Sequence, residues 1–138
     1  MSNYNDIDIQ SFVNNLTEKT KSLEIKWEKV PRVHYHKLID RSIIYSNIKN
    51  PFYSQSKNGN VIIGKFDKKV YYEEDQYYYE DSFFITISNS TFGDVTTFLD
   101  NDDDNSLGFS FAVSLSKLHR LIQLNINDIK NRLDNWFD

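Results

Sequence analysis

The stretch that decides the fold is residues 8–27, DIQSFVNNLTEKTKSLEIKW, because its hydrophobic period changes halfway along. In the first part, apolar side chains recur at threes and fours, which is one face of an α-helix, at Ile9, Phe12, Val13 and Leu16. In the second part, the interval falls to two, which is the period of a half-buried strand, at Leu23, Ile25 and Trp27. The stretch predicts a helix over 8–20, capped by Asn5, Asp6 or Asp8, and then a strand over 23–27.

The residues that follow predict a meander of further strands. An Asn-Gly step at 58–59 is a strong turn signal, and it separates an extended segment over 33–48 from a strand over 61–66. Strand propensity is high at both ends of 70–81 and a charged turn lies in the middle. Two more strands are predicted, over 82–88 and 95–99.

The strongest helix signal lies at the C-terminal end. Apolar side chains recur at threes and fours over about six turns, at Leu115, Leu118, Ile122, Ile126, Ile129, Leu133 and Trp136. Leu121 and Leu124 lie off this stripe; we expect the sheet to cover Leu121, while an exposed Leu124 would allow a homodimer through this helix.

Together the elements predict a single domain, 1–138, of the α+β class. It would consist of an N-terminal helix, an antiparallel sheet of about five to six strands, and a long C-terminal amphipathic helix packed on the sheet. Its 138 residues are enough to bury a substantial core.

Composition excludes several classes of protein. With no Cys among 138 residues, disulfide scaffolds, thiolate zinc sites and Cys nucleophiles are ruled out. The formal net charge of −4 argues against a protein that coats nucleic acid, because such a protein needs a basic surface. The N-terminus has no signal-peptide pattern and apolar runs are short, so we expect a cytoplasmic protein with no membrane partner.

Catalytic and cofactor motifs find no match. The chain contains neither Gly-x-Ser-x-Gly nor Gly-x-Gly-x-x-Gly nor a Walker A sequence, so we expect no cofactor and lean against an enzyme. The acidic run Asp100–Asn105 does not match a calcium-binding EF-hand, because the required Gly and Glu are replaced by Asn105 and Phe111. A solvated loop is the better interpretation.

A His-x-His pair offers one candidate metal site. In an extended segment His34 and His36 would point to the same face and could hold a metal ion together with a third ligand. That ligand would be His119, the only other histidine, or one of twenty carboxylates. The alternative is that they are two half-exposed strand histidines.

The most distinctive feature is a cluster of tyrosines and acids. Neighbouring residues of a strand point to opposite faces, so some of these tyrosines must lie on the surface. Exposed Tyr rings beside carboxylates form a good surface for a protein partner, preferably a basic one. The alternative is a hairpin in which Tyr rings pair across strands for stability. The cluster comprises Tyr71, Tyr72, Glu73, Glu74, Asp75, Tyr77, Tyr78, Tyr79, Glu80 and Asp81.

The chain also resembles small uncharacterised accessory domains of bacteria and phages. The resemblance begins in Phe12–Trp27, where a helix containing Leu16 and ending in Lys19-Thr20 leads to Ile25-x-Trp27, and it continues through Phe83–Leu99 and Leu115–Leu133. It implies a β-meander and a closing helix in a bacterial conflict, immunity or phage-encoded system, and it carries no active site.

These observations favour a non-enzymatic protein-binding module of the immunity, inhibitor or adaptor type, acting through the Tyr/acid hairpin. One alternative is a small metal-dependent hydrolase or nuclease that uses His34, His36 and an acid. Another is a ligand sensor with a pocket between the sheet and the C-terminal helix, walled by Trp27 and Trp136.

Overall fold

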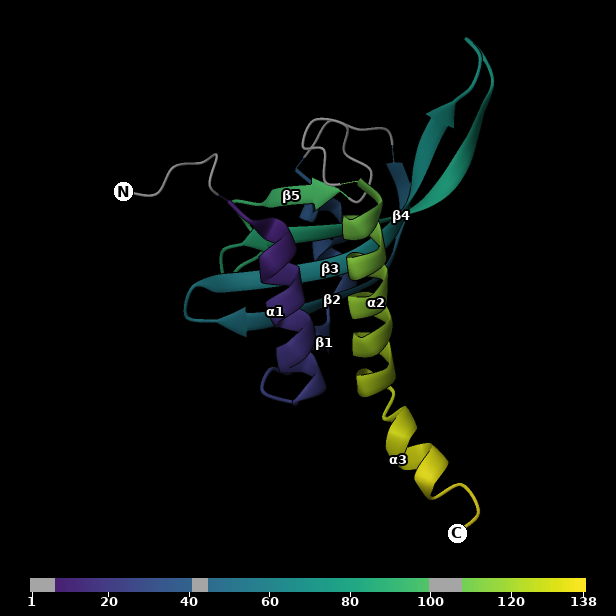
Figure 1. The fold of residues 1–138 in the computed structure, drawn as a ribbon. Coiled ribbons are helices and arrows are strands. Elements are labelled where there is room, and N and C mark those ends of the chain that lie inside the picture. The colour runs from purple at the N-terminus through teal and green to yellow at the C-terminus, as the bar shows by residue number, and fades with distance from the viewer. Residues whose placement is uncertain (1–6, 41–44, 100–107) are drawn as a thin grey trace.

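A five-stranded antiparallel sheet forms the centre of the molecule, and two helices pack on one of its faces (Figure 1). The computed structural model describes residues 7–40, 45–99 and 108–138. The strands lie side by side in chain order, so the sheet is a meander, and the predicted α+β class is confirmed. The elements are α1 (Ile9–Lys21), β1 (Glu28–Lys29), the 3-10 helix η2 (Arg32–Lys37), β2 (Tyr45–Ser56), β3 (Gly59–Tyr71), β4 (Tyr77–Ser88), β5 (Thr96–Leu99), α2 (Gly108–Ile126) and α3 (Ile129–Asp134).

Both faces of the sheet are covered. On one face, Ile63 and Ile85 pack with residues of α1 and α2. On the other face, their neighbours Ile62 and Phe84 pack with Leu38 and with further apolar residues of the segments before and after the central strands. Successive side chains of β3 and β4 therefore enter two separate cores, which explains their continuous apolar runs.

Helix α1 forms as the sequence predicts. Asp8 caps it by accepting a hydrogen bond from the Ser11 backbone N–H at 3.0 Å. Three of the predicted apolar residues, Ile9, Val13 and Leu16, are buried, whereas Phe12 is exposed at the edge of the helix.

The strand predicted over 23–27 is wrong. The chain reverses after α1, and Leu23 adopts a positive φ of 62° and is exposed. Trp27 enters the core and donates its indole N–H to the hydroxyl of Thr20 at 3.0 Å. Only Glu28–Lys29 pair with β2, so the alternation of period two reflects burial of single side chains and not a strand ladder.

The extended segment predicted over 33–48 is also wrong in its first part. Pro31 precedes η2, whose residues Arg32–Lys37 form a 3-10 helix. The following Leu38 and Ile39 turn inward and are buried against the sheet. Strand β2 begins at Tyr45 and thus includes only the end of the predicted segment.

The predicted C-terminal helix is interrupted. α2 buries Leu115, Leu118 and Ile122, but it ends at Ile126, and Asp128 adopts a left-handed conformation with φ 53°. α3 then leads away from the sheet, as Figure 1 shows, and Trp136 is exposed. The single packed helix that the stripe predicts is therefore wrong beyond Ile126.

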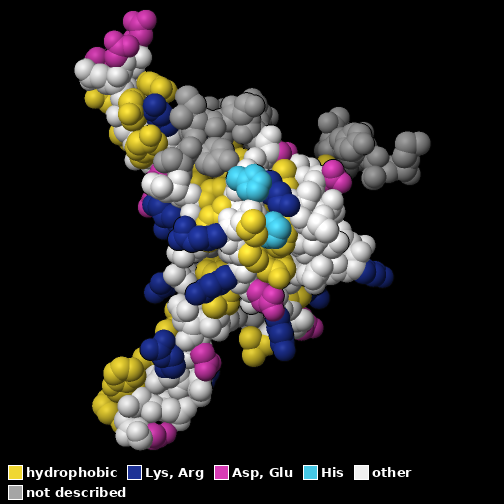
Figure 2. Space-filling model, turned by 180° about the vertical axis from the view of Figure 1, so that it is seen from behind, with side chains coloured by type: hydrophobic (Ala, Val, Ile, Leu, Met, Phe, Trp, Pro, Cys, Tyr) yellow, Lys and Arg dark blue, Asp and Glu magenta, His cyan; other side chains and the backbone are white. Residues whose placement is uncertain are grey.

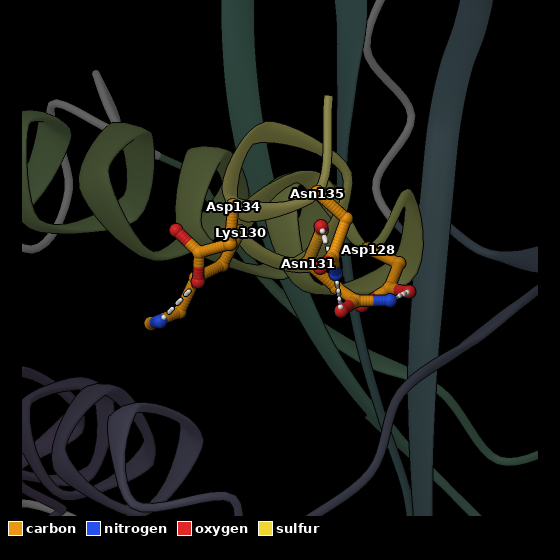
Figure 3. A network of polar contacts seen from close by, with 5 residues as sticks. All are labelled: Asp128, Lys130, Asn131, Asp134 and Asn135. Carbon is orange, nitrogen blue, oxygen red and sulfur yellow. Dashed lines mark hydrogen bonds and ion pairs between the residues drawn. The ribbon is translucent and has the colours of Figure 1, made fainter. Parts of the chain in front are cut away.

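Polar side chains stabilise α3 locally (Figure 3). Lys130 bonds to Asp134 at 2.8 Å, and Asn135 donates to the side-chain oxygen of Asn131 at 2.7 Å. Asn131 in turn donates to Asp128 at 3.2 Å. These contacts span three and four positions, so they stabilise the helix itself and do not attach it to the body.

Leu121 and Leu124, the two leucines that lie off the predicted stripe, are both half-buried. They line an open groove of about 600 Å³ beside α3, together with Leu23 and Leu133. The homodimer through this helix remains a prediction.

The three strand predictions at 61–66, 82–88 and 95–99 are confirmed, because they fall within or overlap β3, β4 and β5. The Asn58-Gly59 step joins β2 to β3, and Gly59 adopts φ 118°, a conformation that side chains rarely allow. The acidic run Asp100–Asn105 lies outside the described residues. None of the helices described over 7–40 and 108–138 has the length and apolar character needed to cross a membrane.

Candidate functional site

The candidate site lies on the outer part of the β3–β4 hairpin, which extends beyond the body of the molecule (Figure 1). We call this part the arm; it comprises residues 67–81. Strands β3 and β4 stay in continuous register from Asn60↔Ser88 to Tyr71↔Tyr77. A tight turn closes the arm, in which Tyr72 N–H donates to Gln76 O at 3.2 Å. All ten residues of the predicted Tyr/acid cluster therefore lie on one projecting structure.

One face of the arm carries three tyrosines and a lysine. The rings of Tyr71 and Tyr77, which face each other across the strands, have centroids 5.6 Å apart, and Tyr77 contacts Tyr79 at the same distance. The ammonium of Lys69 lies 3.8 Å from the centroid of the Tyr77 ring, a cation–π contact. Hydrogen bonding to Tyr71, and the neighbouring tyrosines, raise the pKa of Lys69.

The opposite face carries Tyr72 and Tyr78, whose ring centroids are 6.2 Å apart. All five tyrosines are 45–60% exposed, so the prediction that some tyrosines lie on the surface is confirmed. The alternative interpretation, cross-strand pairing of rings, also describes the structure. The rings support one another and still leave about half of their surface open to a partner.

Four of the five acids of the cluster fall into two groups. Glu73, Glu74 and Asp75 form the exposed turn at the tip, where Figure 2 shows acidic side chains beyond the hydrophobic ones. Asp81 lies at the base, where Lys49 bonds to it at 3.0 Å. The tip acids are thus presented to a partner, whereas the charge of Asp81 is balanced within the chain.

Sequence reasoning missed Lys49, which connects the base of the arm to β2. Its ammonium bonds to Asp67 at 2.8 Å as well as to Asp81, and these two carboxylates are directly opposite in the ladder. The hydrogen bond from Lys49, and a further one from Asn47, lower the pKa of Asp67. No sequence pattern joins Lys49 to residues 18 and 32 positions away, so only the sheet register reveals this contact.

The two predicted metal-ligating histidines do not point in the same direction from their segment, because the segment is not extended. In a 3-10 helix, positions two apart point about 240° apart, so the face shared by His34 and His36 in an extended strand is lost. His34 stacks on Phe92 with ring centroids 4.6 Å apart, and His36 is exposed. The described residues contain no group of three or more His, Asp or Glu side chains that could hold a metal ion.

His119 lies on the helix-covered side of the sheet, away from His34. It is 3% exposed, and its Nε2–H donates to Asn50 O at 2.9 Å. Phe52 and Phe83 contact its ring. Burial lowers its pKa, so His119 is a neutral core residue and does not complete a site with His34.

A groove of about 690 Å³ opens between α1 and the sheet. The pocket expected between the sheet and the C-terminal helix had Trp27 and Trp136 as its walls, but Trp27 is buried in the core and Trp136 is exposed beyond α3. Neither lines the groove. Its apolar lining includes Ile9, Phe12, Leu16, Val61, Ile87 and Phe98.

No protein-family model matches the chain, and neither a curated protein nor a solved structure shows significant similarity to it. The arm and the groove must therefore be interpreted from their own geometry and chemistry.

Proposed function

We propose that this protein is a non-enzymatic binding module, of the immunity, inhibitor or adaptor type expected for bacterial or phage systems, which docks a protein partner on the arm. The observation that carries the proposal is the projection of five half-exposed tyrosines and an acidic tip beyond both cores. Large exposed rings on a two-stranded hairpin add little to the body's stability, yet they provide rigid contact area.

The chemistry of the arm favours a basic partner. Nine residues, 72–80, contain four acids and neither Lys nor Arg. Opposite charge speeds association and selects among partners, while aromatic rings provide most of the binding energy in interfaces of this kind. Tyr contributes both area and a hydroxyl, so the arm combines apolar contact with hydrogen bonding.

A capture experiment with matched variants tests this function. The tagged chain is compared with the triple variant Tyr77→Ala, Tyr78→Ala and Glu74→Lys in a lysate of the cells from which it comes. We expect the amount of specific partner captured by the variant to fall by a factor of about ten or more, because the variant removes two aromatic contacts and reverses one charge.

The control is a triple variant that changes similar groups away from the arm. Leu133→Ala and Trp136→Ala remove two exposed apolar side chains near the C-terminal end, and Glu18→Lys reverses one acid on α1. This variant should retain the partner fully. A partner captured equally by the wild type and by the arm variant would contradict the proposed site.

The groove between α1 and the sheet supports a second candidate function, binding of a small apolar ligand. Its volume and predominantly apolar lining fall within the range of small-molecule sites. Titration with the apolar dye Nile red should give saturable fluorescence that Phe12→Arg, at the rim, abolishes. Unchanged dye binding by this variant would contradict ligand binding in the groove.

A further inference from the structure

Along the arm, no strand among the residues that the structure describes pairs with the outer side of β4. β3 pairs with one side of β4 over its whole length, whereas β5 pairs with the other side only over Phe84–Ile87. Within 7–40, 45–99 and 108–138, the outer side of Tyr77–Asp81 is paired with no strand. Such an edge presents a row of backbone N–H and C=O groups that can bond to a further strand.

This edge lacks several of the usual protections against strand addition, and its only charged residues are the acids Glu80 and Asp81. Natural edge strands are commonly blocked by Lys, Pro or a β-bulge. Residues 77–81, Tyr-Tyr-Tyr-Glu-Asp, contain no Lys or Pro, and the β3–β4 register runs without a shift. β2, in contrast, has register shifts on both sides of Lys49. The edge of β4 is therefore regular, and tyrosine favours the extended conformation it requires.

Charge selects the strand that this edge accepts. In the turn and the β4 strand of the arm, all charged residues are acids. The lysines of the arm, Lys68 and Lys69, belong to β3. Two copies joined by their β4 edges would place two segments with net charge of the same sign side by side, and like charges on adjacent strands are destabilising. A basic strand gains attraction at the same positions. Lys69 over the Tyr77 ring shows the contact that a partner's lysine would make with the exposed rings.

We propose that the partner of the arm contributes an extended basic segment, which adds to the sheet as a strand along Tyr77–Asp81. This inference rests on the proposed function of the arm as a protein-binding site. Side chains of an added strand alternate between the two faces, so Lys or Arg residues on it would meet Tyr77 and Tyr79 on one face and Tyr78 and Glu80 on the other. Backbone hydrogen bonds would provide affinity, and the tyrosines and acids would provide selectivity.

The test uses the full chain, labelled for NMR, and an acetylated eight-residue peptide of alternating Lys and Thr. We expect the peptide to shift the amide signals of residues 77–81. It should also slow hydrogen exchange about tenfold at saturation at the alternate positions whose N–H groups point to the outer edge, because strand pairing protects backbone N–H groups. Peptides N-methylated at all odd or at all even positions keep their charge but lose the alternate donors. One of the two should bind at least about tenfold more weakly.

A charge-reversed pair of variants tests the selectivity. Glu80→Lys should weaken peptide binding about three- to tenfold at low salt, whereas Glu18→Lys, on α1, should leave it unchanged. A peptide of alternating Glu and Thr should not bind. Equal binding of the Glu peptide would overturn the basic character of the segment.

The remaining outcomes separate this inference from the proposed function. Equal affinity of both methylated peptides would show binding by side chains alone, which overturns strand addition and leaves the arm as a binding surface. Protection of 77–81 in the free chain that is lost on dilution would assign the edge to a second copy and overturn a basic partner. Absence of peptide binding, with partner capture still dependent on the arm, would also overturn strand addition and preserve the proposed function.

Discussion

The inner and outer halves of the β3–β4 hairpin share one uninterrupted ladder but have opposite environments. In the inner half, the pair Ile63↔Ile85 is 0% exposed, because helices cover it. In the outer half, the pair Tyr71↔Tyr77 is 50% and 45% exposed. Backbone pairing is the same in both halves, so the difference lies in what packs on the side chains. The ladder therefore supports the arm, while the core stabilises the body.

This division has a consequence for function. Removing a side chain from the inner half should reduce the free energy of unfolding of the whole domain, because it leaves a cavity. Removing one from the outer half should change mainly what the arm can bind. A large stability effect of an arm substitution would contradict the division.

The largest contrast is expected between Phe84→Ala and Tyr78→Ala. Phe84 is fully buried in the core on the sheet face opposite α1 and α2, so its truncation should lower the free energy of unfolding by about 3–5 kcal/mol. Tyr78 is half exposed, and its truncation should cost less than about 1 kcal/mol. Urea denaturation of both variants measures the two values. Similar losses of stability in the two variants would contradict the division between arm and body.

A smaller effect is expected from Thr20→Val, which preserves shape and removes one hydroxyl. Thr20 accepts the indole N–H of Trp27 and donates to Leu16 O at 2.7 Å. Valine would leave the buried indole N–H without its acceptor, which should cost about 1–3 kcal/mol. Thermal or urea denaturation measures the loss, and Thr17→Val, at a less buried position of the same helix, serves as control. Equal losses would show that the Trp27 contact adds nothing.

The Trp27 contact also shows where sequence reasoning about the fold succeeds and where it fails. The Asn58-Gly59 turn and the strands around it were predictable, because turn chemistry and alternation are local. The alternation over 23–27 wrongly predicts a strand. Trp27 is buried because it packs in the core and donates its indole N–H to Thr20 on α1, and the period of the sequence does not encode that contact. The end of α2 was missed for a similar reason: the apolar stripe continues past Asp128, where the backbone turns left-handed.

For the candidate site, the sequence identified the residues but not their presentation. A charged turn between tyrosine-rich strands predicts a hairpin with surface tyrosines, and the structure has one. Whether anything covers Tyr71 and Tyr77 depends on where β5 and the helices end, which is a matter of tertiary packing. The two histidines were misplaced because Arg32–Lys37 forms a 3-10 helix, and their shared face existed only in an extended strand.

The pH dependence of stability should sharpen the contrast through His119, which packs against the inner half. Burial holds its pKa below the ordinary value of 6.5. Below pH 6.5 the unfolded chain therefore binds a proton that the folded chain does not, and stability falls as pH decreases until the folded pKa is reached. The slope from one such group is at most about 1.4 kcal/mol per pH unit.

Comparison of the wild type with His119→Gln isolates this contribution, since glutamine retains a donor for Asn50 O and does not titrate. The difference in free energy of unfolding between the two proteins, measured in urea from pH 7.5 to 5, should decrease toward low pH. A constant difference would show that His119 is protonated equally in both states.

The smallest effect is expected at the junction of the two halves, from Lys49→Met. Lys49 holds the opposed carboxylates Asp67 and Asp81, and methionine would leave two like charges facing each other across the ladder. Because Lys49 lowers the pKa of Asp67, the salt bridge stabilises the folded chain above the ordinary Asp pKa, and this stabilisation is lost as pH falls through the pKa of the folded state.

Amide hydrogen exchange tests the Lys49→Met variant. Exchange should be faster than in the wild type in the arm but not around Ile63, and added salt should reduce the difference. Lys57→Met, in the exposed β2–β3 turn, removes the same charge from a side chain that forms no ion pair with the residues that the structure describes. If amide exchange in Lys49→Met rises equally in both halves of the hairpin, the arm and the body unfold together as one cooperative unit.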